Sequence, residues 1–462
     1  MKTQAFPRIM IAGTGSGCGK TTITCGLLKA LVNRGTRTAA FKCGPDYIDP
    51  MFHTEVTGTK ARNLDTFLCG ENSVKYLLAS NCRDVDIAVI EGVMGYYDGL
   101  GSDGSHSSYA ISRLTGTPVI IVLKPEGMAL SVAAIVKGFA DFLPGSNIKG
   151  VIINSVSQSL YPMYKQMIEE NTGIKVYGYL PEVPEAVIES RHLGLVTAGE
   201  ISDLQRKLQI LADNFEKYVD IEGILRLAES AAEVVYEPPF KVLQKYNCNI
   251  AVAKDRAFCF YYEDALRLLE QMGATLKYFS PLNDTGLPSD IDGLVLGGGY
   301  PELYARQLSE NKSMLDNIKK VVEKGLPTYA ECGGFMYLQQ TITVSGSKTF
   351  PMVSAVEGNS MMQKHLSRFG YVTLTAGEDN LFCSRGGKIA AHEFHFSDSD
   401  KNGNSFYAEC PGGGTGWECI FAGKSLFAGY PHIHFYGNPG FAEKFVQKCC
   451  EYRKGNLGQA NR

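Results

Sequence analysis

At 462 residues the chain is too long for a single hydrophobic core, and the usual size of domains predicts two or three. Apolar residues make up 44%, charged residues 20%, and the formal net charge is -3. This is the composition of an ordinary globular protein, and it argues against a disordered chain, a membrane protein or a nucleic-acid binder.

The sequence shows no pattern of a signal peptide, a membrane span or paired cysteines. The N-terminus runs from Met1 directly into a strand and a glycine loop, without the features of a signal peptide. The longest apolar runs of the whole chain fall short of the roughly 18 residues that a membrane span needs. The 13 cysteines are scattered and form no C-x-x-C pair, so the sequence predicts neither a zinc site nor a disulfide framework. We expect a cytoplasmic protein with no membrane partner.

The first half of the chain alternates β-branched runs with helical patterns. The runs are "RIMIAGT", "RTAAFKC", "DIAVIEGV", "PVIIVLK", "IKGVIINSV" and "KVYGYLP". Strand and helix in this rhythm predict an α/β fold with a parallel sheet covered on both faces.

The stretch "AGTGSGCGKTT" follows the first run and opens a helical pattern, which is the context of a phosphate-binding loop. Its glycines let backbone N–H groups face a polyphosphate, while Lys20 reaches the terminal phosphates and Thr21 offers a hydroxyl to Mg²⁺. One detail departs from the standard spacing, because Thr14 stands where a glycine is usual and Gly13 lies one position earlier. A glycine-rich turn without a ligand is the alternative. The predicted nucleotide-binding residues are Gly13, Gly15, Gly17, Gly19, Lys20, Thr21, Thr22 and Lys42.

Carboxylates follow two further strands of the predicted sheet. Glu91 ends "DIAVIE" at the edge where open α/β sheets bind ligands, and Asp46 lies in a turn after "RTAAFKC". Magnesium prefers oxygen ligands, so Thr21, Asp46 and Glu91 are the predicted metal ligands. A strand-end glutamate facing water and ordinary turn aspartates are the alternatives.

The same two loops also supply candidates for substrate binding. They are Tyr47, Asp49 and Asp98. Tyr96 and Tyr97 precede Asp98 and could cover a large flat ligand, but packing within the loop explains them equally well.

After an amphipathic helical stretch around residues 203 to 235, the Pro-Pro pair in "YEPPFKV" predicts a domain boundary. We place it at residue 242, giving domains 1–242 and 243–462. The second domain starts with "NIAVAKD", a helix over residues 262 to 272, and the strands "TLKYFSP", "DGLVLGGG" and "LPTYAE". It also reads as α/β, with a region richer in β-structure and glycine from residue 350 to 435.

Cys332 lies in "PTYAECGGFMYLQ", between an apolar strand and a helical pattern. This is the place of a nucleophile on a strand-to-helix turn, where a helix N-terminus lowers the pKa of a thiol. The glycines beside it and those of "LGGGYPE" predict backbone donors for an oxyanion, at Gly298, Gly299 and Gly333.

A thiolate nucleophile also needs a proton carrier. His432 and His434 alternate in "AGYPHIHF" and are the candidates. A histidine on a strand is by itself more often a packing residue, and the reading as a base depends on the cysteine and the glycine loop in the same domain.

The motifs "LGGGYPE", "AECGGFMYL" and "AGYPHIHF" resemble the glutaminase domain of class I amidotransferases, in the divergent form of the cobyrinic acid synthases. The motifs "AGTGSGCGKTT", "KCGPDYIDPMFH", "VIEGVMGYYDG" and "ESRHLGL" resemble the cobyrinic acid a,c-diamide synthase family, in order and over nearly the whole chain. The extra residue in the phosphate loop resembles that of dethiobiotin synthetase-like ATPases.

The resemblance implies a role for each site. Cys332 would attack glutamine with His432 as its base, in a dyad, because His434 stands where many class I enzymes have a glutamate. The N-terminal domain would use ATP and Mg²⁺ to phosphorylate a carboxylate of a corrinoid, and ammonia would then displace the phosphate. Asp46, Tyr47, Asp49 and Asp98 would contact the metal or the macrocycle. His392, Glu393 and His395 in "AAHEFHFSD" would shape an interface or the substrate cleft, or serve packing.

Several alternatives remain open from the sequence. Nickel-sirohydrochlorin and hydrogenobyrinic acid a,c-diamide synthases share these motifs, and cobyric acid synthase has the same architecture. From a different class, a regulatory phosphate-loop ATPase could carry a glutaminase-like domain that only binds. The expected partners are glutamine, ATP and a tetrapyrrole, with no nucleic acid, and a homodimer is a further expectation.

Overall fold

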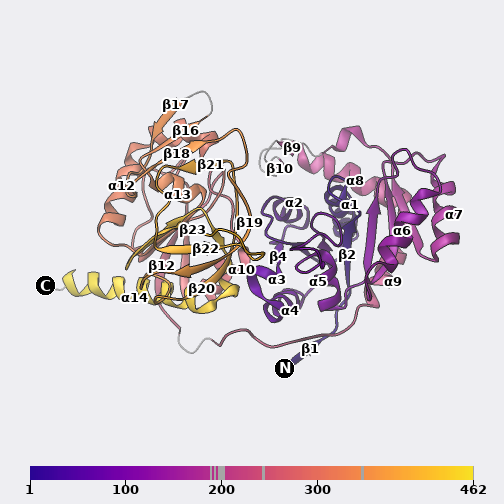
Figure 1. The fold of residues 1–462 in the computed structure, drawn as a ribbon, viewed down its shortest axis with the longest axis horizontal. Coiled ribbons are helices and arrows are strands. Elements are labelled where there is room, and N and C mark those ends of the chain that lie inside the picture. Colours follow the sequence, from indigo (N-terminus) through magenta and orange to yellow (C-terminus); the bar gives the residue numbers. More distant parts are fainter. Residues whose placement is uncertain (188–189, 192–193, 196–202, 242–244, 345–347, 461–462) are drawn as a thin grey trace. The chain divides into compact units, whose positions relative to one another are not determined.

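The computed structural model describes residues 1–187, 190–191, 194–195, 203–241, 245–344 and 348–460 (Figure 1). The chain forms two compact units, of which the first comprises Met1–Thr66 and Gly70–Pro238 and the second Phe67–Cys69 and Pro239–Arg462. The predicted boundary at residue 242 lies outside the described residues, as do parts of the "ESRHLGL" motif.

The first unit is built on a seven-stranded sheet in which every neighbouring pair is parallel. This confirms the predicted α/β fold with a parallel sheet. The strands in spatial order are β4 (Arg62–Leu64), β3 (Thr38–Cys43), β5 (Ile87–Glu91), β2 (Arg8–Gly13), β6 (Val119–Leu123), β7 (Ile148–Asn154) and β8 (Lys175–Leu180).

Both faces of this sheet are buried, which explains why its strands are apolar without alternation. On β7, Ile152 belongs to one hydrophobic cluster, whereas Val151 and Ile153 belong to another on the opposite face. The helices of this unit are α1 (Lys20–Asn33), α2 (Ile48–Thr57), α4 (Glu71–Ser80), α5 (Ser108–Thr115), α6 (Ser131–Asp141), α7 (Tyr161–Thr172), α8 (Leu204–Tyr218) and α9 (Ile221–Glu229).

Short elements complete the first unit. Strands β1 (Lys2–Gln4) and β11 (Val234–Tyr236) form an antiparallel pair that joins the two ends of this part of the chain. The others are α3 (Thr66–Cys69), whose last three residues belong to the second unit, η1 (Pro184–Ala186), β9 (Ser190–Arg191) and β10 (Gly194–Leu195).

The second unit has a six-stranded sheet that is parallel except at one edge. In spatial order its strands are β13 (Ala274–Phe279), β12 (Cys248–Ala253), β14 (Gly293–Leu296), β15 (Thr328–Glu331), β25 (Leu426–Gly429) and β24 (Phe421–Ala422). Its helices are α10 (Glu263–Gln271), η3 (Pro301–Tyr304), α11 (Ala305–Glu310), α12 (Lys312–Glu323), α13 (Gly333–Leu338), η4 (Phe435–Gly437) and α14 (Pro439–Ala460).

Two smaller sheets account for the predicted β-rich region. One is antiparallel, with the order β23 (Trp417–Cys419), β22 (Phe406–Glu409), β19 (Arg368–Ala376), β20 (Lys388–His395) and β26 (His432–Ile433). The other has the order β17 (Lys348–Pro351), β16 (Thr341–Val344), β18 (Asn359–Met362) and β21 (Ser397–Ser399).

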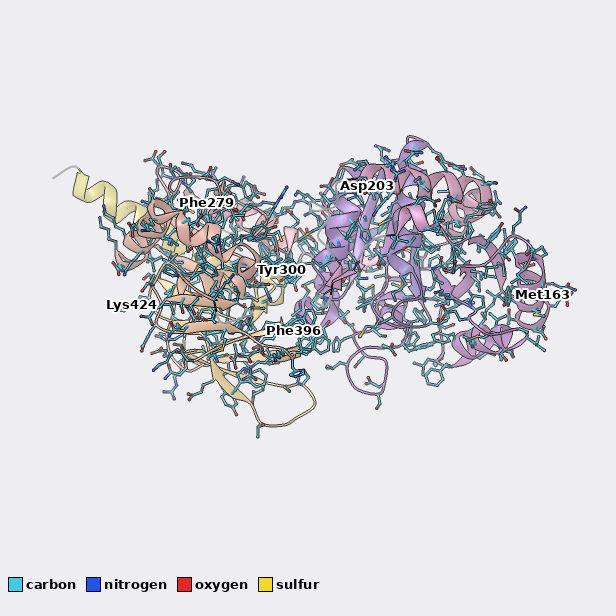
Figure 2. The ribbon with its side chains drawn as sticks, turned by 90° about the horizontal axis from the view of Figure 1, so that it is seen from above. Met163, Asp203, Phe279, Tyr300, Phe396 and Lys424 are labelled. Atoms are coloured by element: carbon cyan, nitrogen blue, oxygen red, sulfur yellow. The ribbon has the colours of Figure 1, made fainter. Side chains whose placement is uncertain are left out.

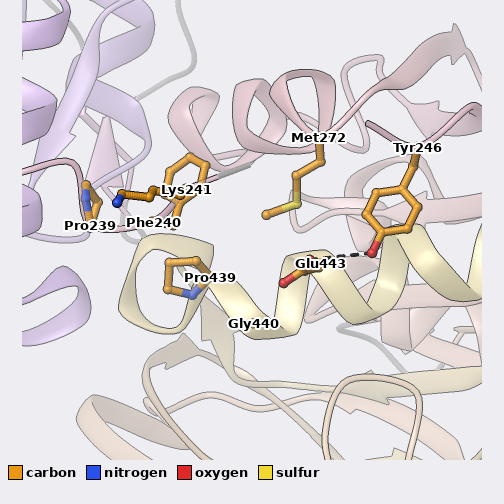
Figure 3. Close-up of a pocket in the computed structure, with 8 residues that line it drawn as sticks. All are labelled: Pro239, Phe240, Lys241, Tyr246, Met272, Pro439, Gly440 and Glu443. Carbon is orange, nitrogen blue, oxygen red and sulfur yellow. Dashed lines mark hydrogen bonds between the residues drawn. The ribbon is translucent and has the colours of Figure 1, made fainter. Parts of the chain in front are cut away.

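Figure 2 draws the side chains of each unit and labels Met163 on α7 of the first unit and Phe279 at the end of β13 of the second. At the start of the second unit, the chain after Pro238 packs against α10 and α14 and leaves a pocket of about 230 Å³ (Figure 3). None of the residues expected at a site lines it. Among the described residues, no helix combines the length and the apolar character needed to cross a membrane.

Candidate functional site

The predicted phosphate loop connects β2 to α1, at the carboxyl edge of the parallel sheet. Gly17 and Gly19 have φ angles of 77° and 98°, a region that glycine enters without strain. At Gly19 space is also limiting, because a Cβ there would lie 2.0 Å from Nδ2 of Asn154. The loop therefore requires glycine at this position for two independent reasons.

Two contacts fix the path of the loop. Asn154, at the end of β7, donates from Nδ2 to the carbonyl of Cys18 at 2.9 Å. The Lys20 ammonium is mostly buried and donates to the carbonyl of Gly15 at 2.9 Å. Burial lowers the pKa of Lys20, although the thiol of Cys18 opposes this effect. The loop is thus held in a turned conformation around a lysine. Gly13 ends β2, Gly15 lies in the loop, and Thr22 lies in the first turn of α1.

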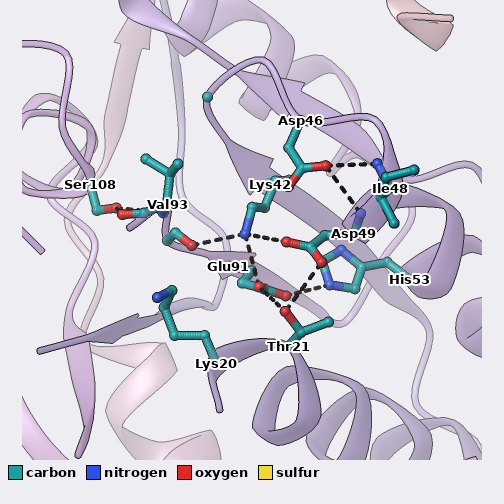
Figure 4. A network of polar contacts seen from close by, with 12 residues as sticks. Lys20, Thr21, Lys42, Asp46, Ile48, Asp49, His53, Glu91, Val93 and Ser108 are labelled. Carbon is teal, nitrogen blue, oxygen red and sulfur yellow. Dashed lines mark hydrogen bonds and ion pairs between the residues drawn. The ribbon is translucent and has the colours of Figure 1, made fainter. Parts of the chain in front are cut away.

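A cluster of charged and polar side chains lies beside the loop (Figure 4). Thr21 donates from its hydroxyl to Glu91 at 2.8 Å and to Asp49 at 3.2 Å. The Lys42 ammonium lies 2.5 Å from Asp49 and 2.9 Å from Glu91, and it also donates to the carbonyl of Gly92. Residues on or after three adjacent strands of the sheet, β3, β5 and β2, therefore contribute to one polar site.

The buried charged groups in this cluster shift one another's pKa values. Burial by itself would lower the pKa of Lys42, but Asp49 and Glu91 outweigh it and raise that pKa well above its ordinary value. Burial would raise the pKa of Glu91, yet Lys42 and His53 hold it below its ordinary value. Burial and the charge of Glu91 raise the pKa of Asp49. Lys42 thus contacts two buried carboxyl groups whose pKa values are shifted in opposite directions.

His53 is a member of the cluster to which we assigned no role from the sequence. Its ring is fully buried, and Nε2 lies 2.7 Å from Glu91. It belongs to the motif "KCGPDYIDPMFH", and its position on α2 one turn after Asp49 was the signal available.

The structure groups the predicted metal and substrate residues differently from the sequence. Asp46 accepts hydrogen bonds from the backbone N–H groups of Ile48 and Asp49, at 2.7 and 3.4 Å, as a carboxylate at the start of α2. It is therefore Asp49, expected at the substrate, that shares the hydroxyl of Thr21 with Glu91. Tyr47 is half-buried immediately before α2.

The loop after β5 is hydrogen-bonded to the phosphate loop. The backbone N–H of Tyr96 donates to the carbonyl of Gly13 at 2.9 Å, and Asp98 accepts from the N–H of Gly95 at 2.8 Å. Tyr96 is fully buried, and Tyr97 packs among Tyr109, Phe139 and Phe142. Packing accounts for both tyrosines, while Asp98 remains exposed beside the loop.

The groups present suit a hard divalent cation. Thr21, Asp49 and Glu91 offer a hydroxyl and two carboxylates at hydrogen-bond distance, which are the donors that Mg²⁺ accepts together with phosphate oxygens. Among the described residues, no group of three His, Cys, Asp or Glu side chains could hold a metal by itself. A cation here would therefore depend on ligands from a bound nucleotide.

In the second unit, Cys332 lies between β15 and α13, at the carboxyl end of the parallel sheet. Its φ of 43° and ψ of -102° are uncommon for a residue other than glycine. The backbone N–H of Cys332 donates to the carbonyl of Gly429 at 2.8 Å, which supports this conformation. Strain of this kind is typical of a nucleophile held at a sharp strand-to-helix turn.

His432 lies close enough to Cys332 for the thiol to raise the pKa of its ring. Its Nδ1 lies 3.4 Å from Oε2 of Glu331, and all three side chains are buried. Burial would lower the pKa of His432, but Cys332 and Glu331 raise it to about 10. The structure thus brings together the cysteine and the histidine that the sequence paired, and it adds a carboxylate.

The glycines expected to supply oxyanion donors meet at this site. A Cβ on Gly298 would lie 2.5 Å from Cε1 of His432, and a Cβ on Gly333 would lie 3.1 Å from the backbone nitrogen of Gly299. Glycine is therefore required where the loop after β14 approaches the start of α13, and a Gly299 amide faces that start.

The other histidines of this unit have different partners. His434 accepts from the N–H of Tyr436 at Nδ1, and burial lowers its pKa to about 3. His392 is paired with His432 across β20 and β26. On the same strand, Glu393 contacts His395 at 3.0 Å, and that ring stacks on Tyr430 with centroids 4.0 Å apart.

Two family descriptions match the two halves of the chain. Residues 9–195 match the CobQ/CobB/MinD/ParA nucleotide binding domain, and residues 249–440 match the CobB/CobQ-like glutamine amidotransferase domain. The chain thus combines a nucleotide-binding part with a glutamine amidotransferase part.

Three relatives that align over nearly the whole chain have the same name. The chain is similar to proteins named cobyrinate a,c-diamide synthase from Caldanaerobacter subterraneus subsp. tengcongensis (40% identity, covering 96% of this chain and 98% of the relative) and Clostridium tetani (42%, 95% and 99%). A protein of the same name from Thermoplasma volcanium is 39% identical and covers 97% of this chain and 98% of its own length.

Proposed function

The chain belongs to the cobyrinate a,c-diamide synthase family, and on that premise we propose that it amidates the a and c acetate side chains of cobyrinic acid in cobalamin biosynthesis. Glutamine supplies the nitrogen and ATP supplies the activation, so the enzyme is a ligase that forms carbon–nitrogen bonds. One observation carries the proposal: a single chain holds both a phosphate loop with a buried carboxylate cluster and a cysteine with a paired histidine.

In the first unit, the loop from Gly13 to Lys20 binds the polyphosphate of ATP through its backbone N–H groups. We assign Mg²⁺ to Thr21, Asp49 and Glu91, where it would supply positive charge to the phosphates. Lys42 pairs with both carboxylates and is the proposed cation for the transferred phosphoryl group.

The chemistry explains why ATP is needed. A carboxylate is a poor acyl donor because its charge repels a nucleophile, whereas an acyl phosphate has a good leaving group. Transfer of the γ-phosphoryl group to the acetate, followed by attack of ammonia, forms the amide and releases phosphate. Asp46, Tyr47 and Asp98 lie on the loops that border the cluster and are the proposed contacts to the corrinoid.

In the second unit, the thiolate of Cys332 attacks the side-chain amide of glutamine with His432 as general base. Backbone N–H groups at Gly298, Gly299 and Gly333 are the proposed donors to the oxyanion. Ammonia released there is the nitrogen source for the first unit.

The scheme predicts that Cys332→Ala abolishes glutamine-dependent amidation and leaves amidation with free ammonium intact, because the thiol supplies nitrogen only. Mass spectrometry of the product with each nitrogen source measures both activities. Cys410→Ala is the matched control, since Cys410 is an exposed cysteine of the same unit. Loss of the ammonium reaction in Cys332→Ala alone would contradict the two-site scheme.

The substrate is tested with a panel of tetrapyrroles in the presence of ATP, Mg²⁺ and glutamine, scored for the mass change of one or two amidations. Cobyrinic acid is expected to gain two amides. Preferred amidation of nickel-sirohydrochlorin or hydrogenobyrinic acid would reassign the substrate, and ATP hydrolysis with no amidation would favour a regulatory ATPase.

We also propose a cytoplasmic location, because all 13 cysteines are free, as expected in a reducing compartment. A homodimer stays a prediction, and light scattering of the purified chain would test it.

A further inference from the structure

The base proposed above, His432, faces a carboxylate that no class I pattern in the sequence pointed to. Oε2 of Glu331 lies 3.4 Å from Nδ1 of His432, and the two residues are 6% and 3% exposed. Contacts of this length in a site without substrate commonly shorten once the substrate is bound.

Glu331 is itself held in place from two sides. Its Oε1 accepts the backbone N–H of Ile433 at 2.8 Å and also the hydroxyl of Tyr329. Glu331 directly precedes Cys332, and Ile433 directly follows His432. One carboxylate therefore ties the strand that ends at the nucleophile to the strand that carries the base.

The other candidates for this role are engaged elsewhere. His434 occupies the position two residues after the base, but its Nδ1 accepts the N–H of Tyr436. Glu393 contacts His395 and Arg368.

We propose that Glu331 is the positioning residue of His432, accepting a hydrogen bond from Nδ1–H and so directing Nε2 toward the thiol of Cys332. The inference deepens the proposed glutaminase function and rests on it. It replaces a dyad with a linear arrangement of Cys332, His432 and Glu331, in which the carboxylate comes from the residue before the nucleophile.

The arrangement accounts for the movement of each proton. The thiol proton of Cys332 passes to Nε2 of His432, and the thiolate forms a bond to the amide carbon of glutamine. The carbon–nitrogen bond then breaks, and ammonia leaves with the proton that His432 returns. Water hydrolyses the thioester, which restores the thiol and releases glutamate. Glu331 stabilises the imidazolium between these transfers.

The substitution Glu331→Gln tests the proposal with little change of shape. The Gln oxygen can keep the bonds from Ile433 and Tyr329, which places the NH₂ group against Nδ1 of His432. That donor favours the opposite tautomer, with the proton on Nε2, so the ring can no longer accept the thiol proton. We expect glutaminase kcat to fall by about 100- to 10,000-fold, as for a misoriented catalytic histidine, with KM for glutamine nearly unchanged.

Two readouts separate positioning from a structural role. Alkylation of Cys332 by iodoacetamide should require a higher pH in Glu331→Gln than in the wild type, because the thiolate loses its imidazolium partner. Amidation with free ammonium should be retained. His434→Asn is the control, since its amide oxygen can replace Nδ1 as acceptor for Tyr436. Its glutaminase activity should equal that of the wild type. An unchanged alkylation profile with unchanged kcat in Glu331→Gln would overturn the proposal.

A measurement on the unmodified protein covers the case in which the variant does not fold. In ¹⁵N-histidine NMR spectra of the full chain, Nδ1 of His432 should stay protonated from neutral pH upward. A neutral ring protonated only at Nε2 would refute the positioning role. If the wild type shows no Cys332-dependent glutaminase activity, the proposed function fails, whereas the NMR result still decides the contact of Glu331 with His432.

Discussion

Glu91 contacts a hydroxyl, an ammonium and an imidazole, and each contact comes from a different segment of the chain. A fully buried carboxylate is stable only when its charge is compensated, and the Lys42 ammonium provides the opposite charge while His53 adds a hydrogen-bonding contact. The cluster therefore gathers the oxygens of Thr21, Asp49 and Glu91 beside the phosphate loop.

We predict that Glu91→Gln loses amidation with glutamine and with ammonium, by about 100-fold or more for loss of a charge-stabilising group. The fold should persist, because Lys42 keeps its ion pair with Asp49. Product formation with each nitrogen source measures the effect. Glu126→Gln, at an exposed glutamate of the same unit, is the control. Survival of the ammonium reaction in Glu91→Gln would remove Glu91 from the ATP site.

At the scale of secondary-structure elements, both sites lie where parallel strands end. The phosphate loop follows β2, Glu91 ends β5, and Cys332 follows β15. Strand ends in an open parallel sheet converge at one edge, so residues far apart in sequence meet there. The elements supply position, and the loops supply the reactive groups.

The contact from β7 to the phosphate loop gives a test at this scale. Asn154→Ala removes the donor to the carbonyl of Cys18, and an unpaired buried carbonyl costs about 1 to 3 kcal/mol. We expect KM for ATP to rise by about tenfold or more, since about 1.4 kcal/mol corresponds to a factor of ten. Glutaminase activity should not change. Asn171→Ala, at an exposed position on α7, should leave both activities as in the wild type. An unaltered KM for ATP in Asn154→Ala would argue against an ordering role.

At the scale of the whole molecule, stability should depend on pH through buried neutral histidines of the second unit. Burial lowers the pKa of His392 and of His434 to about 3. Below the ordinary histidine pKa, the unfolded chain binds protons that the folded chain does not. The free energy of unfolding therefore decreases as the pH is lowered through that range. His432 has the opposite shift, but below its ordinary pKa it is protonated in both states and adds nothing there.

We therefore expect the free energy of unfolding to decrease between about pH 6.5 and pH 4, by about 1.4 kcal/mol per pH unit for each of the two histidines. Urea unfolding followed by the fluorescence of Trp417 reports on this unit, because the chain has a single tryptophan. His434→Asn should reduce the slope by the share of one histidine. A slope that is unchanged in this variant would exclude His434 as a source.

The sequence alone determined the α/β class, the glycine loop between a strand and a helix, and the sharp turn at Cys332, because each depends on a local pattern of a few residues. Spacing fixes a glycine loop, and a strand followed by glycines fixes a sharp turn. Tertiary structure decided three contacts that the sequence did not predict. They are those of Asp49, rather than Asp46, with Thr21, of His53 with Glu91, and of Glu331 with His432. Those contacts join segments that are 28, 38 and 101 residues apart, and only the packing of strands and helices sets such distances.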